Sequence, residues 1–222
     1  MARTATALVL SCALTTALAG AAHADMTQER YRACLDQVSA NAEEAYEDAM
    51  IWRAQGGGWP AEHCASLAQI AQGWSATGAA RLRANAEGAT QASDMSRAIM
   101  FGQAGDAFLY ARQFDEAAGA FARGLDFAPS DAGLARGLAD AAYARGDLDG
   151  AVAAADAALD INPGEPGALG VRAAARLEQG AFDAAADDIA TALSADPENI
   201  ELLVLRGRLN EARRTGQIPE RN

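Results

Sequence analysis

The chain has 222 residues, of which 50% are hydrophobic and only 6% aromatic, and its formal net charge is -12. Its length and apolar content suit a globular or repeat protein of one or two domains with a substantial core. The acidic balance argues against sequence-independent nucleic-acid binding and against adsorption to anionic lipid, because both need a positive surface. Alanine is frequent, and since alanine favours helices and close helix contacts, we expect packed helices.

The first 24 residues predict a secretory signal. Arg3 supplies a positive start, residues 5–19 are apolar and uncharged, and the tripeptide ending at Ala24 fits a small-x-small cleavage site. The apolar run is short for a membrane span of about 20 residues. A lipoprotein signal at Cys12 fits less well, because apolar sequence continues beyond that cysteine. We therefore expect cleavage after Ala24, a periplasmic location and no membrane insertion of the mature chain.

Cleavage leaves two cysteines, Cys34 and Cys64. In an oxidising compartment an even pair predicts one disulfide, which would contribute about 3–4 kcal/mol by restricting the unfolded chain. Two other interpretations stay open at this point. The cysteines could be free buried thiols, or they could bind a metal with His63, although two Cys and one His make an incomplete set for structural zinc.

The region from residue 25 to residue 91 predicts helices of less regular pattern, including one over residues 40–55. The glycine triplet at residues 56–58 ends that helix, and Pro60 suits the first turn of the next. We interpret the triplet as a hairpin and not as a phosphate loop, which would need Lys-Ser/Thr after it. Gly78 is expected to break the chain before a further helix, and the surrounding helix pair suggests a degenerate repeat.

Downstream, three prolines recur with a spacing of 34 residues. Aligning the chain on them brings small and large residues into register: an alanine twelve positions before each proline, Phe or Leu fifteen before, and Leu four before. The aligned sets are Pro129, Pro163 and Pro197; Ala117, Ala151 and Ala185; Phe114, Leu148 and Phe182; and Leu125, Leu159 and Leu193. This period and pattern resemble the tetratricopeptide repeat (TPR) family.

The resemblance predicts three repeats, over residues 98–131, 132–165 and 166–199, with two helices in each. In the second repeat we expect helices over residues 131–145 and 148–161. Gly146 would end the first helix, Asp147 would cap the second, and Pro163 would stop it. Gly180 occupies the column of Gly146 in the third copy, where the first copy has Arg112.

The resemblance implies an all-α fold, a right-handed superhelix of antiparallel helix pairs, because one pair cannot bury its apolar face alone. A capping helix over residues 200–214 would end it, followed by a flexible tail over residues 215–222. In that helix the leucines would pack on the last repeat and the arginines would face solvent. These are Leu202, Leu203, Leu205 and Leu209, and Arg206, Arg208, Arg213 and Arg214.

The segment from Cys34 to Cys64 also resembles the N-terminal part of exported alphaproteobacterial TPR proteins of unassigned function. Trp52, the glycine triplet and the pair His63-Cys64 carry this resemblance. A disulfide would then pin the first helix of the region to the helix that starts at Pro60.

The sequence shows no catalytic constellation. His63 is the only histidine after cleavage, and a disulfide would remove its neighbouring thiolate. The adjacent acids Asp187 and Asp188 are expected on a solvated helix face, because neighbouring helix positions do not face each other. We predict no enzyme activity, metal or cofactor.

The TPR resemblance implies a concave groove, lined by the first helix of each repeat, that takes a peptide or partner protein. Acidic residues stand where the family's carboxylate-clamp variants have Lys and Asn, which argues against recognition of a C-terminal carboxylate. The leading hypothesis is an exported binding scaffold. The alternatives are a self-associating assembly factor of the cell envelope and a redox protein using Cys34 and Cys64. By register, the groove would expose Asp106, Leu109, Arg136, Asp140, Tyr143, Leu177 and Arg208.

Overall fold

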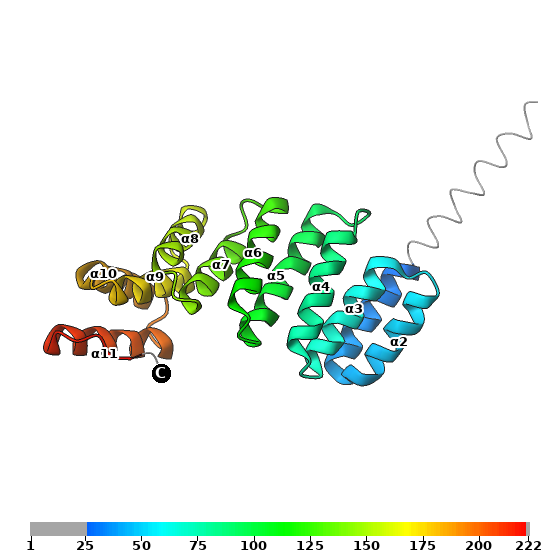
Figure 1. Cartoon of the computed structure of the whole chain (residues 1–222), viewed down its shortest axis with the longest axis horizontal. Coiled ribbons are helices and arrows are strands. Elements are labelled where there is room, and N and C mark those ends of the chain that lie inside the picture. Colours follow the sequence, from blue (N-terminus) through cyan, green and yellow to red (C-terminus); the bar gives the residue numbers. More distant parts are fainter. Residues whose placement is uncertain (1–25, 221–222) are drawn as a thin grey trace, which may run out of the picture. The chain divides into compact units, whose positions relative to one another are not determined.

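The computed structural model describes residues 26–220, which form two compact units, one ending at Trp74 and the other beginning at Ser75. Every regular element in this range is a helix, as predicted (Figure 1). The expected signal sequence, with its cleavage site after Ala24, lies outside the described residues. Within residues 26–220, no helix combines the length and the apolar character needed to cross a bilayer.

The first unit contains three helices: residues 26–40, α2 (Ala42–Ala54) and α3 (Gly58–Ala71). The Cys34–Cys64 disulfide is present and joins the first of these helices to α3. Cys64 is completely buried and packs with Ala49 and Ala65, so the bond belongs to the core of this unit. The free-thiol interpretation is therefore wrong.

The glycine triplet forms the turn between α2 and α3. Gly56 and Gly58 have φ angles of 91° and 59°, in the left-handed region that glycine adopts without strain. At Gly57 the obstacle is spatial, because a Cβ there would lie 2.6 Å from the Trp52 ring. The triplet thus lets the chain turn tightly beside the buried Trp52, and the predicted hairpin between the two helices is present.

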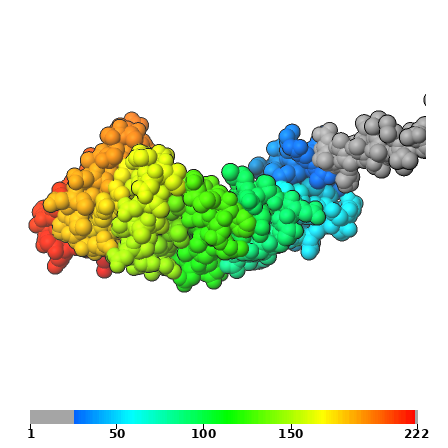
Figure 2. All heavy atoms as spheres, turned by 90° about the horizontal axis from the view of Figure 1, so that it is seen from above, coloured from blue at the N-terminus to red at the C-terminus, as the bar shows by residue number. Residues whose placement is uncertain are grey.

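The second unit is a series of antiparallel helices. Each helix packs on the next, and α5, α7, α9 and α11 also pack on one another in that order. These four helices therefore form one side of a solenoid, whose repeats follow in chain order in Figure 2. The elements are α4 (Ser75–Gly88), α5 (Asp94–Tyr110), α6 (Phe114–Phe127), α7 (Ala132–Ala144), α8 (Leu148–Ile161), α9 (Pro166–Glu178), α10 (Phe182–Ala195) and α11 (Ile200–Thr215).

The helix ends of the second repeat follow local signals. The Asp131 side chain accepts a hydrogen bond from the backbone N–H of Leu134 at 3.0 Å and caps α7. Gly146, with φ of 86°, ends that helix, and Gly180 does the same in the third repeat with φ of 77°. In the first repeat Arg112 holds this position with φ of 58°, and it is the only non-glycine residue with positive φ in the described part of the chain.

The expected break at Gly78 is wrong. Gly78 is buried inside α4, and the chain breaks earlier, at Gly73, which has φ of 89°. A glycine within a helix is tolerated where packing favours the helix, whereas a left-handed glycine after the last turn ends it. The identity of the residue alone did not distinguish these two environments.

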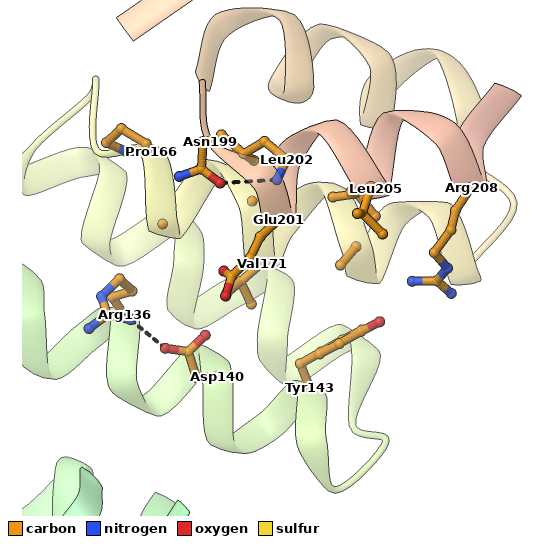
Figure 3. A pocket seen from close by; sticks show the side chains of 14 residues that line it. Arg136, Asp140, Tyr143, Pro166, Val171, Asn199, Glu201, Leu202, Leu205 and Arg208 are labelled. Carbon is orange, nitrogen blue, oxygen red and sulfur yellow. Dashed lines mark hydrogen bonds and ion pairs between the residues drawn. The ribbon is translucent and has the colours of Figure 1, made fainter. Parts of the chain in front are cut away.

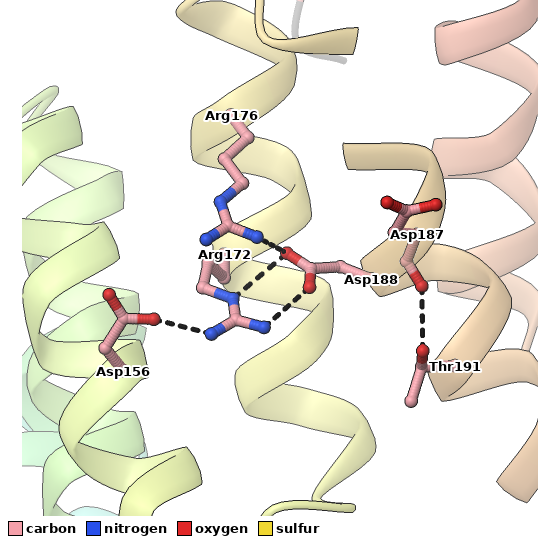
Figure 4. Close-up of polar contacts among 6 residues, drawn as sticks. All are labelled: Asp156, Arg172, Arg176, Asp187, Asp188 and Thr191. Carbon is pink, nitrogen blue, oxygen red and sulfur yellow. Dashed lines mark hydrogen bonds and ion pairs between the residues drawn. The ribbon is translucent and has the colours of Figure 1, made fainter. Parts of the chain in front are cut away.

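The expectation that Asp188 lies on a solvated helix face is wrong. Asp188 is 4% exposed and lies on α10 opposite Arg172 and Arg176, which are one turn apart on α9 (Figure 4). Arg172 donates to the two carboxylate oxygens at 3.0 and 2.6 Å, and Arg176 donates at 2.7 Å. Arg172 also donates to Asp156 on α8 at 2.5 Å. Of the two adjacent acids only Asp187 is exposed, so an ionic cluster around the buried Asp188 replaces the expected solvated pair.

The last helix, α11, buries Leu202, Leu205 and Leu209 against the third repeat. Its opposite face is polar. Arg206 and Asn210 stand three periods after Ala104 and Phe108, which are 0% and 2% exposed in α5. The apolar contact that Ala104 and Phe108 provide in α5 therefore has no equivalent at these two positions of α11.

A candidate binding trough formed by α7, α9 and α11

A cavity of about 470 Å³ lies between α7, α9 and α11. We call it the trough: α9 forms its floor, and α7 and α11 form its walls (Figure 3). The lining residues are Arg136, Asp140 and Tyr143 of α7; Pro166, Gly167, Gly170, Val171 and Ala174 of α9; and Asn199, Glu201, Leu202, Val204, Leu205 and Arg208 at α11.

The floor is low because α9 carries small residues on one face. Gly167, Gly170 and Ala174 are three and four positions apart, which places them on the same side of a helix. A Cβ at Gly170 would lie 3.2 Å from a methyl group of Leu202, so glycine also permits the close approach of α11. Beside this floor Val204 is 57% exposed, which gives the α11 wall an apolar surface.

One end of the trough is crowded with carboxylates. Arg136 pairs with Asp140 at 2.6 Å, and Glu201 extends from α11 toward α7 (Figure 3). Burial raises the pKa of Asp140 to about 6; Arg136 opposes this shift, and Glu165, Asp106 and Glu201 add to it. One arginine therefore faces several acids at this end.

The other end holds a polar network that connects the three helices. The Tyr143 hydroxyl donates to Glu178 at 2.6 Å, and Arg208 lies 3.5 Å from the same carboxylate oxygen. Arg208 also donates to the carbonyl of Pro219 at 3.1 Å, while its Nε is buried without a hydrogen-bond partner. Burial, and then the bond to Glu178, raise the pKa of the Tyr143 phenol. The positive charge of Arg208 is thus already matched by a carboxylate.

The structure brings four of the groove residues predicted from register to the trough: Arg136, Asp140, Tyr143 and Arg208. Their contact with a partner stays a prediction. Asp106 is exposed on α5 and Leu109 is partly buried there, and neither lines the trough. Arg208 is only 18% exposed, so its expected orientation toward bulk solvent is wrong.

The expectation for Leu177 is also wrong, because it is 0% exposed and packs with Ile189, Leu205 and Leu209. One position along a helix turns a side chain by about 100°, and the next residue, Glu178, reaches the Tyr143–Arg208 network. Sequence reasoning missed Glu201 and Val204. Both stand one period after floor glycines of α9, so the repeat spacing could have identified them.

The cysteine region offers no comparable site. His63 is 4% exposed and its Nδ1 is hydrogen-bonded to the Tyr31 hydroxyl. No group of three or more His, Cys, Asp or Glu residues within residues 26–220 could hold a metal ion. Within the disulfide, Cys64 is completely buried, whereas Cys34 is partly buried.

The fold defines the class as an α-helical repeat solenoid, with an open trough on one side. Residues 103–166 match the family model for the tetratricopeptide repeat. This segment of the chain therefore carries tetratricopeptide repeats. No curated protein matches the sequence significantly.

Solved structures of TPR proteins share the fold. YrrB, described as a TPR protein with an unusual peptide-binding site, is 14% identical with a TM-score of 0.65, covering 78% of this chain and 88% of its own. MamA from Desulfovibrio magneticus RS-1 is 16% identical with a TM-score of 0.65, over 80% and 97%. The first TPR of Spaghetti (RPAP3), bound to the HSP90 peptide SRMEEVD, is 22% identical with a TM-score of 0.53, over 55% and 98%.

Proposed function

We propose that this protein is an exported scaffold that binds a peptide or partner protein in the trough. The trough carries the proposal: it is an open cavity with an apolar floor, an exposed valine on one wall and charged groups at both ends. Binding sites commonly combine apolar surface with a few placed polar groups. The peptide sites named for YrrB and for the RPAP3 repeat support peptide binding by this fold.

Export is supported by the sequence pattern up to Ala24 and by the disulfide, since structural disulfides persist in oxidising compartments. N-terminal sequencing of the protein from a periplasmic fraction should begin at Asp25. An intact N-terminus, or recovery from the cytoplasm alone, would contradict export without affecting the binding proposal.

Site-specific photocrosslinking in the producing cell tests binding in the trough. A photoreactive phenylalanine analogue replaces Val204 on the trough wall, and the matched control replaces Asp160, which is exposed on α8. We expect a discrete adduct with another protein from position 204 and none from position 160. Equal adducts from both positions, or none from either, would refute a trough partner. An adduct with a second copy of this chain would favour the assembly-factor alternative.

A further inference from the structure

We infer that the trough accepts a partner segment in which a bulky apolar side chain lies beside a basic one. This inference rests on the proposed function and adds the chemistry of the partner. It follows from two properties of the trough that lie next to each other: its small-residue floor and the excess of carboxylates at one end.

The charge argument starts from Asp140. Its carboxylate is paired with Arg136 at 2.6 Å, yet its side chain is still 28% exposed. Glu201 lines the same end of the trough from α11, and Glu165 and Asp106 also act on Asp140. A lysine or arginine of the partner would be attracted by this group and would reduce the repulsion within it.

The apolar argument starts from the floor. Gly167, Gly170 and Ala174 line the cavity from α9, and Arg136 and a methyl group of Leu202 lie close above the two glycines. Val171 and the exposed Val204 line the same cavity. An aliphatic or aromatic side chain resting there would cover apolar surface of the floor and the α11 wall, and such burial favours association.

An acidic partner would fit poorly. At the end that holds Asp140 and Glu201, its carboxylates would meet these two acids, and Arg136 is already paired with Asp140. At the other end Arg208 is paired with Glu178 and bonded to the Pro219 carbonyl. Neither arginine offers an unopposed positive charge, so the trough selects a cation over an anion.

A random peptide display library, selected against the purified protein at low ionic strength, provides the probe. We expect enriched peptides to carry Arg or Lys next to a large apolar residue. Their binding should weaken as salt is added, because exposed charge pairs are screened.

Three variants at exposed positions separate the possible outcomes. Glu201→Arg should weaken the selected peptides by about tenfold or more. Asp160→Arg, with the same change in net charge on α8, should leave their binding within about twofold, because Asp160 does not line the trough and exposed charges are screened. Val204→Gln removes apolar wall surface without changing the charge and should also weaken binding. Circular dichroism and thermal unfolding of each variant verify that the fold is retained.

Each outcome decides between the two proposals. Acidic or uncharged peptides that lose binding with Val204→Gln would overturn the inference and leave the proposed function standing. Peptides that bind wild type, Glu201→Arg and Val204→Gln equally well, or failure to select any peptide, would count against the trough as a binding site.

Discussion

The first and third repeats fill equivalent positions in opposite ways. In the first repeat Phe108 and Ala120 are buried and apolar. Two periods later the same positions hold Arg176 and Asp188, which form an ion pair at 2.7 Å. The backbone period is the same in both repeats, and only the chemistry of the packing differs.

This difference shows what the repeat architecture requires. The helix pairs must be held at one spacing, and either aromatic packing or a satisfied ionic cluster can do so. Burying charge has a desolvation cost that offsets much of the attraction, so the ionic cluster need not be more stable than an apolar one. Its geometry is specific, however, because Asp188 accepts from Arg172 and Arg176 together.

The largest expected effect lies in the aromatic repeat. Phe121 is 2% exposed, and its ring occupies the space next to Gly105 and Gly137, where a Cβ would lie 2.6 and 2.4 Å away. Phe121→Ala should lower the free energy of unfolding by about 4 kcal/mol, because it leaves a cavity. Urea denaturation measures this change. Phe127→Ala, at a partly exposed site, should have a smaller effect, and equal losses would contradict the burial argument.

In the ionic repeat, Asp188→Asn should cost about 3 kcal/mol, because it leaves two arginines without their shared carboxylate. The adjacent Asp187→Asn, at an exposed position, should stay within about 0.5 kcal/mol of wild type. Urea denaturation of the two variants in parallel provides the test. Similar values for both would mean that the buried cluster contributes little.

A third comparison uses two acids in different surroundings: Asp188 faces two arginines, whereas Asp140 has only Arg136. In the folded protein the pKa of Asp140 is about 6, above its usual 3.8. The folded protein therefore favours the protonated form of Asp140. The stabilisation that results from this preference is fully present below about pH 4 and is lost as the pH rises through about 6.

Between pH 4 and pH 6 the free energy of unfolding should fall by an amount on the order of 2 kcal/mol. Asp140→Asn should flatten this part of the pH profile. Because Asp106, Glu165, Glu201 and Arg136 also face this carboxyl, the test is the difference between wild-type and variant unfolding curves. Parallel curves from pH 4 to 7 would contradict the shift.

The ionic cluster of the third repeat should be replaceable by apolar packing of the kind found in the first repeat. Arg172→Leu, Arg176→Phe and Asp188→Ala together copy residues found in the same columns of earlier repeats. We expect this triple variant to remain within about 1 kcal/mol of wild type, because apolar packing replaces Asp188 and both of its arginines, and the remaining Asp156 side chain is 48% exposed. A loss as large as that of Asp188→Asn would show that the third repeat has become dependent on charge.

The smallest expected effect concerns the turn between the helices of the first repeat. Arg112 adopts a φ of 58° where the other repeats have glycine. Arg112→Gly should relieve backbone strain and raise stability by about 0.5 kcal/mol, since the arginine also lies over the Phe114 ring and that contact would be lost. The reverse change, Gly146→Arg, should destabilise the second repeat. Thermal unfolding of both variants tests the sign.

Local signals allowed much of the fold to be predicted. The period of the prolines, the capping residue Asp131 and the left-handed Gly146 act within a few residues of the helix ends that they determine. The pairing of Cys34 with Cys64 was predictable from the even number of cysteines and the expected export of the chain.

Which individual side chains are buried and which are exposed was harder to predict. Leu177 and Glu178 differ by one helix position, and Asp187 and Asp188 are chemically identical, so their burial depends on the helices packed against them. One signal was available: Arg176 and Asp188 both replace apolar residues in the same repeat. Two opposite charges that appear together at positions that are apolar in the first two repeats indicate a pair.

The polar outer face of α11 has a consequence for assembly. If a solenoid ended in an apolar surface, the end of a second molecule could pack on that surface. Repeated head-to-tail contacts of this kind produce filaments. Arg206 and Asn210 are polar, whereas Ala104 and Phe108 at the equivalent positions of α5 provide apolar packing surface within the chain. At these two positions, therefore, α11 offers no apolar surface for such an end-to-end contact.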